Sequence, residues 1–169
     1  MNRVIDVDAS VAAVDAIGDL FRQSMRRLAS AVSIVACESD GEWFGLSATS
    51  VTSLSMEPPS LLVCLNRSAS LTPMLHQDKP FSVNLLDRRH QNVSNAFGSS
   101  SLRAERFRDG GWQLSERGVP VMAEAIASIE CDVGKLVEYG SHIIVIGEVR
   151  HVRIGEGVDP LIYCNGKYQ

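Results

Sequence analysis

Small hydroxyl side chains gather in one stretch of this chain, where they could bind a polar ligand. They occupy the end of a strand predicted over residues 43–51 and the segment after it: Ser47, Thr49, Ser50, Thr52 and Ser53. Hydroxyls at alternate positions, followed by an irregular turn, offer side-chain and amide hydrogen-bond donors together. On spacing alone, however, an edge strand whose Ser and Thr side chains face solvent is the favoured alternative.

A polar loop, Asn66-Arg67-Ser68-Ala69-Ser70, is the second candidate. It follows an apolar run over residues 60–65 and precedes Thr72-Pro73, a pair typical of a helix N-terminus. Free amides, hydroxyls and a guanidinium at such a place can bind a phosphate. A plain polar loop explains the same spacing about equally well.

The motifs of other enzyme classes are missing. Gly155-Glu156-Gly157 is the only GxG, and Pro160 stands where a dinucleotide fingerprint needs its third glycine. There is no phosphate loop, no HExxH or clustered Cys/His spacing, and no GxSxG, so neither a metal nor a serine nucleophile is supported. Among the histidines, His142 at the start of the longest predicted strand is kept as a candidate. We interpret the others as structural or solvated: His76, His90 and His151.

The elements that must position these residues follow from hydrophobic periodicity. An amphipathic helix is predicted over residues 10–29, with Ser10 as its N-cap. Its apolar stripe comprises Val11, Val14, Ile17, Phe21, Met25 and Leu28. The period then changes to two, which predicts strands over residues 32–36, 43–51, 60–65, 81–85, 129–133, 143–154 and 161–164. Short helices are predicted over residues 72–78 and 87–97. Strands without regular βαβ alternation indicate a mainly β fold, a closed or partly closed antiparallel barrel with flanking helices.

Size and composition limit the remaining classes. The 169 residues fit one domain, residues 1–169, and a net charge of −4 lacks the electrostatic footprint of a nucleic-acid binder. No apolar stretch approaches the ~18 residues that a membrane span needs, and the first residues do not look like a secretion signal. The cysteines stand far apart in apolar runs: Cys37, Cys64, Cys131 and Cys164. This is typical of free thiols, so we expect a cytoplasmic protein.

Five segments in order resemble the short-chain flavin reductases, the reductase components of two-component monooxygenases such as the one acting on 4-hydroxyphenylacetate. They are Gly45 to Pro59 (GLSATSVTSLSMEPP), Leu62 to Ser68 (LVCLNRS), Phe81 to Leu86 (FSVNLL), Phe97-Gly98-Ser99, and Gly140-Ser141-His142 leading to Gly147-Glu148-Val149. The resemblance covers nearly the whole chain. It implies an FMN-binding split barrel, an antiparallel Greek-key β-barrel with flanking helices, that works as a homodimer.

The resemblance also implies roles for individual residues. The flavin contacts would be Ser47, Ala48, Thr49, Ser50, Thr52 and Ser53, then Asn66, Arg67, Ser68 and Ser70 toward its phosphate end, and Phe97 and Gly98 against it. His142 would meet the nicotinamide as the catalytic residue, although Ser141 stands where relatives have an aspartate. The tail resembles a segment that covers the pyridine nucleotide: Asn165, Gly166, Lys167 and Tyr168.

The activity implied is hydride transfer from NADH or NADPH to non-covalently held FMN or FAD, with reduced flavin supplied to a flavin-dependent monooxygenase. For direct hydride transfer, the protein has to stack the two rings in the right geometry and provide suitable electrostatics, and it needs little acid–base machinery. Two alternatives remain. One is a reductase that keeps its flavin bound and reduces another acceptor, such as a cobalt corrinoid. The other is a non-catalytic flavin- or heme-binding split-barrel protein.

Overall fold

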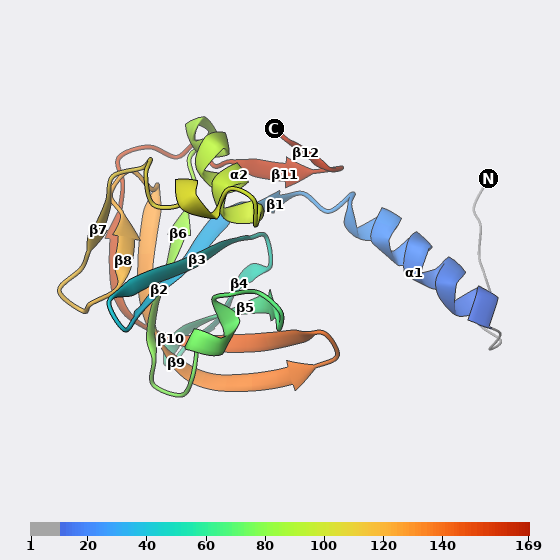
Figure 1. Cartoon of the computed structure of the whole chain (residues 1–169), viewed down its shortest axis with the longest axis horizontal. Helices are drawn as coiled ribbons and strands as arrows, with labels where there is room; N and C mark the ends of the chain where they lie inside the picture. The colour runs from blue at the N-terminus through green and yellow to red at the C-terminus, as the bar shows by residue number, and fades with distance from the viewer. Residues whose placement is uncertain (1–10) are drawn as a thin grey trace.

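The computed structural model describes the backbone of residues 11–169 and the side chains from residue 16 onward. Its helices are α1 (Val11–Met25) and α2 (Gln91–Gly98), with 3₁₀ turns at Thr72–Met74, Arg88–His90 and Arg103–Glu105. Its strands are β1 (Ser30–Ala31), β2 (Ser33–Ser39), β3 (Glu42–Ala48), β4 (Val51–Met56), β5 (Pro59–Asn66), β6 (Pro80–Leu85), β7 (Trp112–Leu114), β8 (Pro120–Met122), β9 (Ala127–Tyr139), β10 (His142–Ile154), β11 (Ile162–Cys164) and β12 (Lys167–Tyr168). Strands thus dominate, as predicted (Figure 1).

A seven-stranded sheet forms the body of the molecule, in the order β3-β2-β6-β9-β10-β5-β4, and all of its strand pairs are antiparallel. Its two edge strands, β3 and β4, are neighbours in the sequence, joined only by Thr49 and Ser50. Because this link is so short, the sheet must curl until its edges approach, although the two edge strands do not pair. The predicted antiparallel fold class is confirmed, and the open seam between β3 and β4 is consistent with a split barrel.

Two hydrophobic clusters lie on opposite sides of β2. Val35 and Cys37 belong to the larger cluster, in which Phe81 from β6 is fully buried. Gly147 on β10 makes room for that ring, because a Cβ at this position would lie 2.5 Å from Phe81 Cζ. Ile34, from the other face of β2, belongs to the second cluster with residues of α2. The helix α2 is therefore packed onto the outside of the sheet.

Several predicted elements have the wrong extent; the strand predicted over residues 129–133, for example, is only part of the longer β9. The strand predicted over residues 43–51 ends at Ala48, because Ser50 already reaches the opposite edge of the sheet, where its Oγ donates to the Cys64 carbonyl at 2.7 Å. The helix predicted over residues 72–78 is a single 3₁₀ turn. Leu75 takes an extended backbone there, which buries its side chain in the larger cluster. The hairpin of β7 and β8 was not predicted at all, since its strands have only three residues each.

The first helix projects away from the body of the molecule (Figure 1). It ends at Met25, earlier than the predicted Ala29, while the predicted N-cap, Ser10, lies outside the described residues. The described part of its apolar stripe is largely exposed, at 64% for Phe21, 46% for Met25 and 59% for Leu28 in the following turn. None of the helices between residues 11 and 169 has the length and apolar character needed to cross a bilayer.

Candidate functional site

A cavity of about 710 Å³ opens at the seam of the sheet. It is bordered by the end of β3, the link to β4, the end of β5 with its following loop, the end of α2 and the start of β10. Antiparallel pairing of β5 and β10 places His142 opposite Asn66, which brings two predicted segments together although they are far apart in the sequence. The predicted site residues that line this cavity are Ser47, Ala48, Thr49, Ser50, Asn66, Ser68, Ser70, Phe97, Gly98 and His142.

The other predicted site residues lie outside this cavity. Thr52 and Ser53 are exposed on the edge strand β4. Arg67 points to the β9–β10 hairpin, where it forms an exposed ion pair with Glu138 at 3.3 Å. The tail from Asn165 to Tyr168 folds back on β11 in a separate three-stranded sheet, so its contact with a nucleotide stays a prediction.

The loop after β5 is held by Asn66 and presents Ser70. The Asn66 side-chain oxygen accepts hydrogen bonds from both the backbone N–H and the hydroxyl of Ser68, each at 2.9 Å. The Asn66 carbonyl accepts a third from the Thr72 hydroxyl at 2.8 Å. The Ser70 side chain is exposed, and its hydroxyl makes no hydrogen bond with any described residue. Ser70 is therefore the hydroxyl of this loop that is free to bind an anion.

Two guanidinium groups supply positive charge to the same cavity. Arg106 donates to the carbonyls of Gly45 at 3.0 Å, Ala96 at 3.2 Å and Ser99 at 3.2 Å, and Arg103 lies on the cavity wall beside it. Neither has a carboxylate partner within the described part of the chain. Burial, and then the charge of Arg103, lower the pKa of Arg106. Neither arginine was predicted as a site residue from the sequence, where their Arg-x-x-Arg spacing after the Phe97-Gly98 motif was the available signal.

An aromatic cluster backs the cavity on the side of α2. Phe97 is only 2% exposed, and its ring meets that of Phe107 edge-on, with 4.8 Å between centroids. This packing requires Gly45 on β3, since a Cβ there would lie 2.6 Å from Phe97 Cε1. Phe97 therefore contributes a rigid apolar wall, and Gly98 ends the helix at the cavity.

His142 lies at the exposed rim of the cavity, at the start of β10. The hydroxyl of Ser141 is hydrogen-bonded to its Nδ1 at 2.9 Å. A neutral hydroxyl thus orients the imidazole, and Nε2 makes no hydrogen bond with any described residue, which leaves it open to a ligand.

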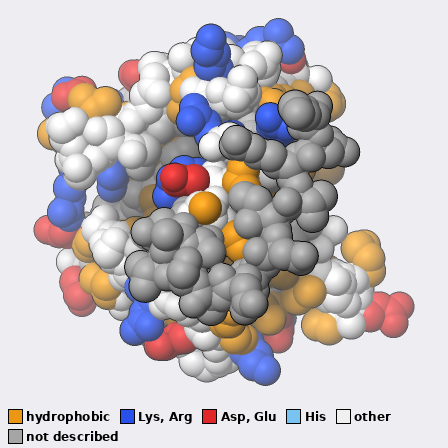
Figure 2. Space-filling model, turned by 90° about the vertical axis from the view of Figure 1, so that its right-hand side faces the viewer, with side chains coloured by type: hydrophobic (Ala, Val, Ile, Leu, Met, Phe, Trp, Pro, Cys, Tyr) orange, Lys and Arg blue, Asp and Glu red, His pale blue; other side chains and the backbone are white. Residues whose placement is uncertain are grey.

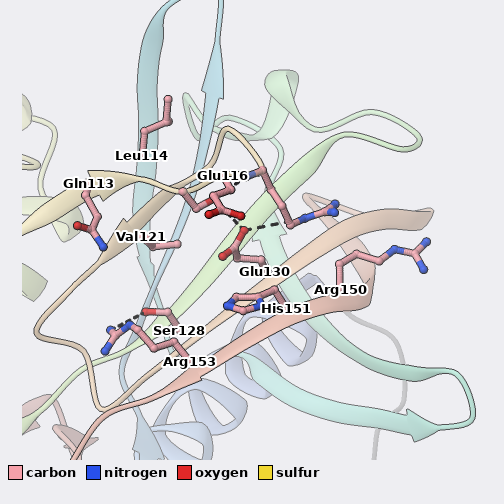
Figure 3. Close-up of a pocket in the computed structure, with 11 residues that line it drawn as sticks. Gln113, Leu114, Glu116, Val121, Ser128, Glu130, Arg150, His151 and Arg153 are labelled. Atoms are coloured by element: carbon pink, nitrogen blue, oxygen red, sulfur yellow. Dashed lines mark hydrogen bonds and ion pairs between the residues drawn. The ribbon is translucent and has the colours of Figure 1, made fainter.

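A second cavity, of about 510 Å³, lies between the β7–β8 hairpin and strands β9 and β10 (Figure 3). Three of the charged side chains that line it, Arg117, Glu130 and Arg150, already have partners. Glu130 accepts a hydrogen bond from Ser115 at 2.8 Å, and Asp132 pairs with Arg117 at 2.6 Å and with Arg150 at 2.8 Å. None of the predicted site residues lines it, so the cavity at the seam is the candidate site.

Comparison with known proteins points to one family. The model of the "Flavin reductase like domain" family matches residues 25–169. The chain is 38% identical over 148 residues to the FMN reductase (NADH) RutF 2 of Rhizobium rhizogenes, which covers 88% of this chain and 86% of that protein. It is 38% identical over 158 residues to the reductase component of the FADH(2)-dependent resorcinol hydroxylase of a Rhizobium species, covering 92% and 88%.

A solved structure extends this likeness to the fold. The NADH:FAD oxidoreductase SgcE6 of Streptomyces globisporus, in complex with NAD and FAD fragments, superposes with a TM-score of 0.83 at 26% identity. The superposition covers 96% of each chain.

Proposed function

Because the chain belongs to the flavin reductase like family, we propose that it is an NADH-dependent flavin reductase that holds FMN or FAD without a covalent bond. The names of similar proteins favour NADH as the hydride donor, and both FMN and FAD occur among them. The observation that carries the proposal is the cavity at the seam, where free hydroxyls, two uncompensated guanidiniums and an apolar wall meet.

The donor set fits a flavin. Ser70, which lines the same cavity as the positively charged Arg103 and Arg106, would hold its phosphate, because charge-assisted hydrogen bonds are the strongest available at such a site. Ser47 and the link at Thr49 would form hydrogen bonds with the polar edge of the flavin ring. When bound, flavin supplies the ring that accepts hydride from the nicotinamide.

His142 would act on the nicotinamide nucleotide. It stands at the open rim, where its ring can donate a hydrogen bond to the amide or phosphates of NADH, and Ser141 keeps the ring oriented. This is a positioning task, which matches a reaction that needs no general base.

A direct test is flavin-dependent oxidation of NADH by the purified protein. Loss of NADH absorbance should require added FMN or FAD and should continue over many turnovers. Tight binding of flavin without NADH oxidation would refute the enzyme and leave a binding protein.

We propose a flavin-dependent monooxygenase as the consumer of the reduced flavin, because a similar protein is the reductase component of a hydroxylase. A diffusing carrier must leave the reductase, so the reduced flavin should dissociate quickly enough to be trapped by cytochrome c. Reduced flavin that stays bound through gel filtration would instead favour the alternative of a fixed acceptor. The free cysteines agree with a cytoplasmic setting.

We also propose a homodimer. An isolated helix of the length of α1 is marginal in water, yet its Phe21 and Met25 side chains are left exposed by the described residues of this chain. Figure 2 looks onto this side of the molecule, where orange hydrophobic side chains are exposed among charged ones. A second copy would bury the stripe and share its cavity rim.

The dimer has a matched test. Light scattering should give about twice the 18.4 kDa chain mass. Phe21→Asp should shift this toward the monomer, whereas Gln23→Asp, on the opposite side of the helix, adds the same charge and should not. A wild type that is monomeric and active would refute the dimer.

A further inference from the structure

The C-terminal strand reaches the candidate flavin cavity through a chain of hydroxyl groups. Ser47 Oγ, on the cavity wall, lies 3.0 Å from Ser94 Oγ on α2. Ser94 Oγ in turn lies 2.9 Å from the hydroxyl of Tyr168 on β12. Ser94 is only 1% exposed, so water cannot easily replace the middle member of the chain.

The fold holds the tyrosine in place for this contact. Asn165 and Gly166 both have positive φ, as in the tight hairpin turns that Asn-Gly favours, and this turn brings Tyr168 opposite Tyr163. The two tyrosine rings pack edge-on with 5.3 Å between centroids. The hydroxyl of Tyr163, however, makes no hydrogen bond with any described side chain.

We propose that Tyr168 is a positioning residue which, through Ser94, directs the proton of the Ser47 hydroxyl toward the flavin. The inference rests on the proposed function, since it requires flavin in the cavity at the seam. It adds a residue of the C-terminal strand to the groups that set the redox behaviour of that flavin.

The direction of the chain follows from acidity. Each hydroxyl has one proton, so the two bonds cannot both be donated by Ser94. A phenol is a stronger acid and a weaker acceptor than an aliphatic hydroxyl, so Tyr168 donates to Ser94. The buried Ser94 hydroxyl has no other acceptor among the described side chains and backbone groups, so it donates its own proton to Ser47. The Ser47 proton is then left for the cavity, and bonds in such a chain strengthen one another.

A hydroxyl that donates into the cavity favours the more electron-rich form of the ligand. The reduced flavin carries more negative charge than the oxidised flavin. Tyr168 should therefore raise the affinity for the reduced form relative to the oxidised form. A purely structural tyrosine would change both affinities alike.

The experiment compares Tyr168→Phe with Tyr163→Phe. The second variant removes a hydroxyl from the paired ring but leaves the series of hydroxyls from Tyr168 to Ser47 intact. The midpoint potential of protein-bound FMN is measured in an anaerobic dye titration. Loss of one hydrogen bond should change the ratio of reduced to oxidised affinity by about two- to tenfold. Tenfold corresponds to a potential lower by about 30 mV. Tyr163→Phe should keep the wild-type potential.

Ser94→Ala breaks the chain in the middle and should lower the potential in the same way, which covers the case that Tyr168→Phe does not fold. The effects of Tyr168→Phe and Ser47→Ala should also be non-additive, because the first acts through the second.

Two outcomes would overturn the inference. If both tyrosine variants and the wild type have equal midpoint potentials, the role of Tyr168 is refuted. The proposed function would stand in that case, since flavin would still bind. A wild type that binds neither FMN nor FAD would refute the proposed function and the inference with it.

Discussion

The clearest test of the phosphate site is Ser70→Ala, with Ser68→Ala as its matched comparison. Both serines belong to the loop after β5, but their hydroxyls are in different situations. The Ser68 hydroxyl already donates to Asn66 at 2.9 Å, whereas the Ser70 hydroxyl is free. A hydrogen bond to a charged group contributes about 1.5–3 kcal/mol. Ser70→Ala should therefore weaken FMN binding by roughly ten- to a hundredfold.

Ser68→Ala should behave differently. It removes one of the bonds that Asn66 accepts in the loop, a loss of about 0.5–1.5 kcal/mol that should appear as lower thermal stability. Fluorescence titration of each variant with FMN and with riboflavin, which has no phosphate, separates the two effects. Ser70→Ala should leave the riboflavin Kd unchanged. If it weakens riboflavin as much as FMN, the phosphate does not bind at this loop.

Three further predictions concern single residues. His142→Ala should raise the KM for NADH and lower kcat/KM, with the flavin Kd and Tm nearly unchanged, because among the described residues this exposed ring bonds to its neighbour Ser141 alone. A lower Tm with normal kinetics would refute its role. FMN should protect Cys64, which lines the cavity, from alkylation but not the half-buried Cys164, as mass spectrometry of labelled peptides would show; equal labelling would exclude this cavity. Burial raises the pKa of Cys131 from 9.0 to about 12, so the folded protein keeps a proton that the unfolded chain releases above pH 9. Cys131 alone should therefore lower the free energy of unfolding by about 1.4 kcal/mol per pH unit in that window, so urea titrations should show a smaller decline for Cys131→Ala.

The fold class could be predicted because the spacing of hydrophobic residues along the sequence reflects whether the local backbone is a helix or a strand. The long strand predicted over residues 143–154 is found as β10, and Asp87 begins the predicted second helical region by accepting a hydrogen bond from the Arg89 amide. The break after Ala48 could not be predicted in this way. The link between β3 and β4 contains no Pro or Gly that would mark the end of a strand in the sequence. The strand ends there because β3 and β4, although adjacent in sequence, lie at opposite edges of the sheet.

The site could be predicted only as separate segments. Hydroxyl and polar-loop patterns indicated Ser47 and Ser70, but nothing in the spacing showed that β10 would set His142 beside them. Arg106 escaped prediction for a related reason. Its partners are backbone carbonyls, one on β3 and two at the end of α2. Every residue type has such a carbonyl, so the sequence does not show which residues will accept these hydrogen bonds.

The position of the cavity follows from the open seam itself. Within residues 11–169, strand β3 pairs with β2 alone and β4 with β5 alone, so the facing edges keep backbone groups that would be paired in a closed barrel. Arg106 satisfies one of them, the Gly45 carbonyl, and thereby carries its charge to the edge of the sheet. A ligand with a polar edge and a phosphate can use the remaining donors together with that charge. The open seam between β3 and β4, which keeps the sheet from closing, therefore creates the binding site. The small Ser and Thr side chains of the link leave room for a ligand there.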